Sequence, residues 1–128
     1  MRRHEDGWRV HGTPWPGDAG IARNRSAPLS ALVFLAQADH NAIVPIAPAD
    51  ALRRLLIVAS VPWYDAEYLP PTLDTADRLL AEVPCYEFRF VKAPSAADTI
   101  IDFARSLPAQ SQRPSAACVI PSAASDLA

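Results

Sequence analysis

The sequence predicts an α/β fold, a mixed sheet with covering helices, in a single domain over residues 7–106. Short runs of strand character alternate along the chain with segments whose apolar residues recur at helical spacing. The chain has 128 residues, of which 50% are hydrophobic and 20% charged, which is ordinary for a globular protein with one core. Residues 1–6 and 107–128 lack such patterns, so we expect a flexible N-terminus and a disordered tail.

The first strands are predicted from alternation and from apolar runs. Apolar and polar residues alternate over residues 7–11, which is typical of a half-buried strand. A nearly continuous apolar run over residues 29–36 predicts a strand covered on both faces. A polar turn at residues 38–41 leads to the apolar segment 43–46. We therefore expect these two segments to pair as a hairpin, with Pro45 placing the second one at an edge.

Two helices are expected next. Proline is tolerated in a first helical turn, so Pro48 begins a helix whose apolar residues share one face as far as Ala59. A second helix is expected over residues 72–83, with Leu73, Ala76, Leu80 and Val83 buried and Pro84 ending it.

The last two elements are a strand and a helix. Residues 85–91 alternate, which places Tyr86, Phe88 and Phe90 on one face and Glu87 and Arg89 on the other. The helix that follows begins near Ser95, whose hydroxyl is expected to cap its first turn. Its core contacts are assigned to Ile100, Ile101 and Ala104.

One glycine-rich loop is the best candidate for function. All four glycines of the chain lie within its first twenty residues, and Gly12, Gly17 and Gly20 share the run 11–20 with two prolines and Trp15. Glycine opens backbone conformations that side chains forbid, whereas proline fixes φ and removes a donor. This mixture indicates a shaped turn and not a slack linker.

Charge and cysteine content exclude several classes of function. A formal net charge of −2 gives no general attraction for nucleic acid or an anionic membrane. No apolar stretch approaches the roughly 18 residues of a membrane span, and no secretory signal is apparent, so a cytoplasmic location is expected. Cys85 and Cys118 lack the spacing of a zinc site, and Cys85 is interpreted as a small core residue.

Several segments together resemble a known family. They are residues 10–18 (VHGTPWPGD), 26–29 (SAPL), 32–35 (LVFL), 48–52 (PADAL) and 83–90 (VPCYEFRF). In this order they are similar to the C-terminal half of bacterial HPr kinase-like proteins, over roughly residues 8–105. The resemblance implies a phosphoenolpyruvate carboxykinase-like P-loop fold. It also implies ATP and Mg²⁺ as cofactors, for transfer of the γ-phosphoryl group to a serine or a small acceptor.

The chain departs from that family at its phosphate loop. A Walker A motif needs glycines followed by a lysine, but Lys92 is the only lysine and no glycine follows Gly20. In the family this loop and the metal-binding acid precede the matched region. The chain therefore resembles a fragment, a split gene product or a degenerate relative, inactive on its own. The implied partners are a Walker A-bearing N-terminal half or a protein or peptide substrate.

The loop carries the candidate site residues. Two guanidinium groups and an amide at residues 23–25 can bind phosphate oxygens, although a solvated loop is the simpler interpretation. The amides around Gly17 line the same site. Trp15 either stacks on a base or, preferably, packs under the loop. The candidate contacts to nucleotide phosphate or substrate are Gly12, Thr13, Trp15, Gly17, Arg23, Asn24 and Arg25.

The remaining polar candidates are weaker. His11 precedes the loop and has a side chain suited to proton transfer, but a polar strand residue is the preferred interpretation. His4 and His40 have no partner at ligand spacing and are expected at the surface, so no metal site is predicted. An acidic group, in which Asp74 and Asp77 are expected to face water, comprises Asp65, Glu67, Asp74 and Asp77.

Two functions from different classes remain open. The first is the C-terminal portion of an HPr kinase-like, ATP-dependent phosphotransferase. The second is a non-catalytic protein- or peptide-binding module on a degenerate kinase scaffold. That module would use Trp63, Tyr64 and Tyr68, because aromatic rings are enriched at interfaces, unless these residues pack under the neighbouring helices.

Overall fold

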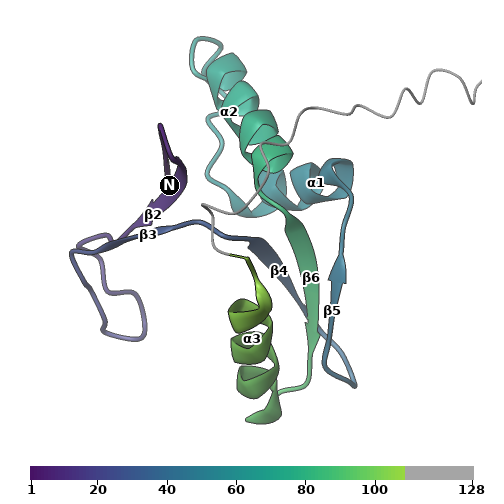
Figure 1. Ribbon diagram of the computed structural model, residues 1–128. Coiled ribbons are helices and arrows are strands. Elements are labelled where there is room, and N and C mark those ends of the chain that lie inside the picture. Colours follow the sequence, from purple (N-terminus) through teal and green to yellow (C-terminus); the bar gives the residue numbers. More distant parts are fainter. Residues whose placement is uncertain (109–128) are drawn as a thin grey trace, which may run out of the picture.

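The computed structural model describes residues 1–108, which form two small sheets and three helices (Figure 1). The antiparallel sheet has the order β1-β2-β3 and the mixed sheet the order β4-β6-β5. The elements are β1 (Arg2–His4), β2 (Gly7–His11), β3 (Ser26–Pro28), β4 (Leu32–Gln37), β5 (Ala42–Pro45), α1 (Pro48–Val58), α2 (Leu69–Glu82), β6 (Cys85–Phe90) and α3 (Ser95–Ser106). The α/β class is confirmed. Most of the expected tail, residues 109–128, lies outside the described part.

The N-terminus is part of the fold. Strand β1 pairs with β2 antiparallel, with His4 opposite Gly7, where the sequence predicted a flexible segment over residues 1–6. Glu5 and Asp6 form the turn between the two strands. Gly7 has a φ of 121°, a conformation that glycine adopts without the strain a side chain would bring. This tight turn brings a charged segment back along β2.

The predicted hairpin of the apolar strands is wrong. Strand β6 lies between β4 and β5, parallel to β4 and antiparallel to β5. The strand with the most buried residues takes the centre, where both of its edges are hydrogen-bonded and helices cover it. Asn41 fixes the β4–β5 connection to the end of β6, since its Oδ1 accepts from the Val91 N–H at 2.9 Å. Pro45 does lie on an edge strand, as predicted.

Two adjacent residues of helix α2 pack against different sheets. Leu79 packs in a cluster with Trp8 of β2, Leu29 and Val83. Leu80 packs in a second cluster, with Ala51 of α1 and Cys85 of β6. The side chains of Leu79 and Leu80 therefore hold the first sheet against the second. The predicted burial of Leu80 and Val83 is confirmed, but the N-terminal half of α2 is only partly covered.

Helix α3 covers the other face of the mixed sheet. Tyr86 follows Cys85 and so points to the opposite face, where its ring meets that of Phe103 edge-on at a centroid distance of 4.8 Å. The expected contacts through Ile101 and Ala104 are wrong, because both residues are exposed. The expected cap is also absent. The Ser95 hydroxyl instead accepts from Asn41 Nδ2 at 3.0 Å.

Glu87 is the buried charged residue of the described core. Its Oε2 pairs with Arg54 of α1 at 2.5 Å and its Oε1 accepts from Arg89 Nε at 2.7 Å. The hydrogen bond from Arg89, then that from Arg54, lowers the pKa of Glu87, against the opposing effect of burial. The carboxylate faces α1, on the side of the sheet opposite the aromatic residues, as the alternation predicted.

Replacement of Glu87 by glutamine is expected to lower the free energy of unfolding at pH 7 by about 1–2 kcal/mol, because charge-assisted hydrogen bonds to two partly exposed arginines are weakened. Because the pKa of Glu87 is lowered in the folded state, the ionised carboxylate stabilises the fold at pH values above its usual pKa near 4.5. This stabilisation is lost as the pH falls through the folded-state pKa. Urea unfolding at pH 7 and pH 3 measures the loss of free energy of unfolding and its dependence on pH. If the parent and Glu87→Gln differed in free energy of unfolding by the same amount at both pH values, the ion pairs of Glu87 would be contradicted.

Candidate functional site

Residues 12–25 form the β2–β3 loop, which projects away from the helices (Figure 1). The two sides of this loop meet at its base, where the Gly12 N–H donates to the Arg25 carbonyl at 2.8 Å. A Cβ built on Gly12 would lie 1.9 Å from the Arg23 carbonyl oxygen. Only glycine lets the two chain segments approach so closely.

The far end of the loop is a shaped turn, as predicted. Gly17 and Gly20 have φ values of 62° and 65°. The Gly20 N–H donates to the Gly17 carbonyl at 3.2 Å, and Thr13 Oγ1 donates to the Trp15 carbonyl at 3.3 Å. These contacts give the loop a defined path from its base to its tip.

Trp15 does not pack under the loop. Its exposed fraction is 78%, so the preferred interpretation of this residue was wrong. The reason is geometric, because residues 11–28 are all exposed and no other element within residues 1–108 covers the loop. The ring remains accessible at the tip, close in sequence to Thr13 and Gly17.

The basic end of the loop is also exposed. Arg23, Asn24 and Arg25 lie in solvent, which agrees with the solvated-loop interpretation. The Arg25 N–H donates to the Arg23 carbonyl at 2.9 Å, so the backbone turns tightly between the two arginines. Within residues 1–108 neither guanidinium group has an ion pair or hydrogen bond. Both are therefore available to an external anion.

His11 has a partner that the sequence analysis missed. The β1–β2 turn brings His4 beside it, with their Nε2 atoms 3.3 Å apart and their rings stacked at a centroid distance of 5.5 Å. Desolvation of the ring, then the charges of His4 and Arg2, lower the pKa of His11. His4 is exposed as predicted, but it is not isolated. The signal in the sequence was the polar pair Glu5-Asp6 before Gly7, which favours a tight turn.

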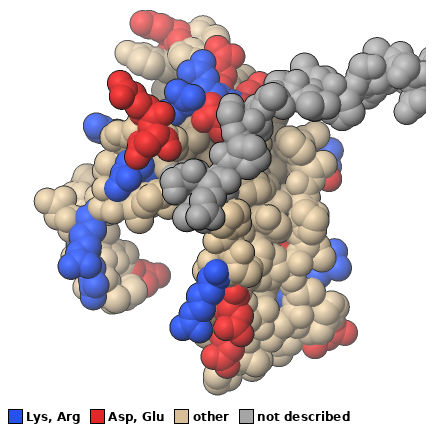
Figure 2. All heavy atoms as spheres, in the orientation of Figure 1, with Lys and Arg blue, Asp and Glu red and all other residues tan. Residues whose placement is uncertain are grey.

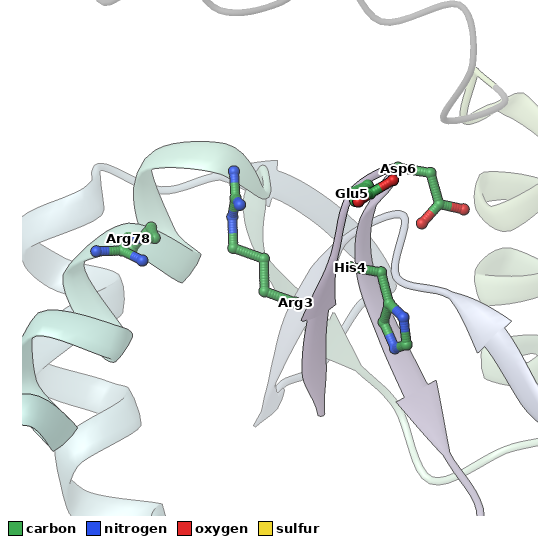
Figure 3. Close-up of a pocket in the computed structure, with 5 residues that line it drawn as sticks. All are labelled: Arg3, His4, Glu5, Asp6 and Arg78. Carbon is green, nitrogen blue, oxygen red and sulfur yellow. The ribbon is translucent and has the colours of Figure 1, made fainter.

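A shallow pocket of about 830 Å³ lies between the β1–β2 hairpin and α2, and Figure 3 shows its lining residues Arg3, His4, Glu5, Asp6 and Arg78. Arg3 extends toward α2, where its Nε donates to both carboxylate oxygens of Glu82 at 3.1 Å. The His4 ring lies on the other side of the hairpin in the same view. The lining side chains do not converge on one point, so the pocket assembles no catalytic set.

The aromatic segment before α2 is exposed. Trp63, Tyr64 and Tyr68 all face solvent, with Tyr64 92% exposed, so packing under the helices was wrong for them. Asp65 has a structural role, since its Oδ1 accepts from the backbone N–H groups of Glu67 and Tyr68 at 3.0 and 3.3 Å. Asp74 and Asp77 are exposed on α2, as predicted.

Cys85 is a core residue, as predicted. Its side chain is buried, its Sγ donates to the Val83 carbonyl at 3.4 Å, and burial raises the pKa of the thiol. A thiol held in this form is a poor nucleophile. Cys118 lies outside the described residues. In the described part of the chain no three side chains of His, Cys, Asp or Glu gather as a metal site would require.

Charges on the visible face are mixed. Figure 2 shows acidic and basic side chains next to one another near α2, and both basic and acidic side chains on the projecting arm at the left. Among residues 1–108 no helix is long and apolar enough to cross a membrane. Comparison of the chain with family models, with curated proteins and with solved structures finds no match in any of the three.

Proposed function

We propose that this chain is the C-terminal lobe of an HPr kinase-like, ATP-dependent phosphotransferase and that it is inactive on its own. It supplies the β2–β3 loop, as a weak contact to the ATP phosphates, to an active site whose Walker A loop and metal-binding acid lie on an N-terminal partner. The observation that carries the proposal is the pair of exposed guanidinium groups of Arg23 and Arg25, which have no partner among residues 1–108, at the base of a shaped glycine loop.

The chemistry of phosphoryl transfer suits such a loop. Catalysis of this reaction consists mainly of positioning and of neutralising charge on the transferred group. Arginine forks bind phosphate oxygens with two parallel hydrogen bonds and keep their charge at any physiological pH. In this role Arg23 and Arg25 orient the transferring group, and the contact at Gly12 holds them at a fixed place beside the antiparallel sheet.

Other loop residues have supporting roles in the proposal. The exposed Trp15 ring is free to stack on a base, and the backbone near Thr13 and Gly17 borders the same surface. Asn24, between the two arginines, adds an amide donor. His11 interacts with His4, so proton transfer is not assigned to it.

Titration of the full chain with Mg-ATP, followed by isothermal calorimetry and by ³¹P line broadening, tests the proposal. We expect saturable binding at millimolar ATP that is lost in the double variant Arg23→Ala, Arg25→Ala. The matched control is Arg53→Ala, Arg105→Ala, which removes the same charge from exposed helical positions. That control should bind ATP like the parent, and Trp15→Phe should weaken binding if the ring stacks on the base.

Two results would contradict the proposal. A folded parent that shows no heat and no line broadening at millimolar ATP would refute nucleotide binding by this lobe alone. Equal loss of binding in the two double variants would show that only net charge matters and would refute the assigned roles of Arg23 and Arg25.

The exposed aromatic segment supports a second candidate, a non-catalytic protein- or peptide-binding module. Trp63, Tyr64 and Tyr68 present three large rings to solvent within six positions of the chain. Such rings are enriched at the centres of protein interfaces. If the folded chain fails to bind Mg-ATP, this second candidate is favoured. Its residues are separate in sequence from the β2–β3 loop, so that result would not count against them.

A further inference from the structure

Strand β4 forms an open edge of the mixed sheet. In the order β4-β6-β5 it pairs on one side only (Figure 1). The Leu32 N–H donates to the Pro84 carbonyl at 3.0 Å, and every second residue of β4 bonds to β6 in the same way. The backbone groups of the residues between them, Val33, Leu35 and Gln37, therefore point away from β6. Among residues 1–108 nothing forms a hydrogen bond with these groups.

The other outer strands of the two sheets carry features that oppose pairing with a further strand. Such features are short length, charged side chains and proline. Strand β1 has three residues, two of them Arg2 and Arg3, and β3 has three residues and ends at Pro28. Strand β5 has four residues and ends at Pro45. Strand β4 has six residues with neither a charge nor a proline, so within the described chain it is the edge most open to another strand.

The side chains beside this edge leave apolar surface in solvent. In the register of β4 with β6, Leu35 lies next to Phe88, on the face that α3 covers. Phe88 is 4% exposed, whereas Leu35 is 69% exposed. The layer that covers this face therefore ends before β4. A further strand beside β4 would bring its own side chains against Leu35 and would cover it.

The β4 strand of a second copy suits this edge. In a twofold pair each residue lies opposite itself or its symmetry mate, so a charged strand would place like charges opposite one another. Strand β4 has no charge to repel its copy. With Leu35 at the twofold axis, Leu35 lies opposite its own counterpart, and Val33 lies opposite Gln37 of the other copy. All three residues point outward, so each antiparallel pair can exchange both of its N–H···O bonds.

We propose that two copies of this chain associate through β4, as an antiparallel pair of strands centred on Leu35 that joins the two mixed sheets into one. Main-chain hydrogen bonds supply the affinity, as in other cases of strand addition, and the covered Leu35 side chains add to it. Each chain has one edge of this kind among its described strands, so the assembly closes at two copies. The proposal is independent of the nucleotide role, because it uses no residue of the β2–β3 loop.

Sedimentation equilibrium of the full chain, with a reductant so that Cys118 forms no disulfide between chains, tests the proposal. We expect the mass of the parent to rise from one chain to two between about 5 µM and about 0.5 mM. Leu35→Lys should increase the dissociation constant at least about tenfold, because like charges opposed at an interface cost that much or more. The matched control is Ile57→Lys, which places the same charge at a 78% exposed position of α1 and should dimerise like the parent.

A charge-reversal experiment tests the position of the axis. Leu35→Lys and Leu35→Glu should each be monomeric alone, but an equimolar mixture should form a heterodimer, because opposite charges then meet at the axis. A mixture that stayed monomeric would overturn the pairing centred on Leu35.

Three other results would overturn association through β4. They are a folded parent that remains monomeric at about 0.5 mM, equal loss of dimer in Leu35→Lys and Ile57→Lys, and a parent that assembles beyond two copies. In the first case the edge would be left for a different chain, such as the N-terminal partner of the proposed phosphotransferase. Circular dichroism confirms the fold of each variant, which the substitutions should preserve because both positions are exposed.

Discussion

Replacement of Trp8 by alanine is expected to lower the free energy of unfolding by about 3–5 kcal/mol, the usual range for truncating a buried aromatic residue. Trp8 is 4% exposed and packs with Leu29, Leu79 and Val83. Its Nε1 also donates to Glu82 Oε2 at 2.9 Å. The truncation leaves a cavity at the junction of the antiparallel sheet with α2. Urea unfolding followed by far-UV circular dichroism measures the loss without relying on the deleted indole.

A matched control uses the same residue type at the surface. Trp15→Ala removes an exposed ring and is expected to change stability by no more than about 0.5 kcal/mol. Trp8→Phe keeps most of the apolar volume but loses the donor to Glu82, so a loss between those of the two alanine variants is expected. Equal effects of Trp8→Ala and Trp15→Ala would show that the antiparallel sheet does not pack on α2 as described.

Replacement of Gly12 by alanine is expected to open the base of the β2–β3 loop, at a cost of about 2–3 kcal/mol. The new Cβ would lie 1.9 Å from the Arg23 carbonyl oxygen, and this neighbour is backbone that cannot rotate away. The hydrogen bond from the N–H of position 12 to the Arg25 carbonyl is then lost. Hydrogen exchange at that amide should become faster, and the unfolding midpoint should fall.

Gly17→Ala is the control for this variant. Position 17 has open space around its Cβ, but its φ of 62° strains any residue with a side chain. A cost of about 1–2 kcal/mol is expected there, without faster exchange at position 12. If Gly12→Ala left the exchange of that amide unchanged, the close approach to Arg23 would be contradicted. Weaker Mg-ATP binding in Gly12→Ala would connect the base of the loop to the proposed function.

Much of the fold could be predicted because its signals are local. Alternation identified β2 and β6, and the apolar face after Pro48 identified α1. The boundaries were less accurate. Strand β4 begins at Leu32 and not at residue 29, and α2 begins at Leu69 because its prolines fit within the first turn. Leu29 instead joins the cluster around Trp8, a long-range contact without a local pattern.

The candidate site was predicted only in part. Glycines and prolines around Trp15 indicated a shaped loop, and Gly17 and Gly20 adopt the left-handed conformations that such a loop needs. The environment of Trp15 was not predictable from its neighbours, because exposure depends on whether another element covers the loop. The pairing of His4 with His11 was missed for a related reason, since it depends on the register of β1 against β2.

The sequence by itself therefore determined the α/β class, the helix at Pro48, the aromatic face of β6, the glycine loop and the absence of a Walker A lysine. All of these depend on residue type and short-range spacing. Only the tertiary structure decided that β6 separates β4 from β5, that the buried Glu87 pairs with two partly exposed arginines, and that β1 belongs to the fold. Strand order and side-chain partners depend on contacts between residues that are distant in sequence. These contacts are decided by how much surface all the elements bury together, which no local pattern contains.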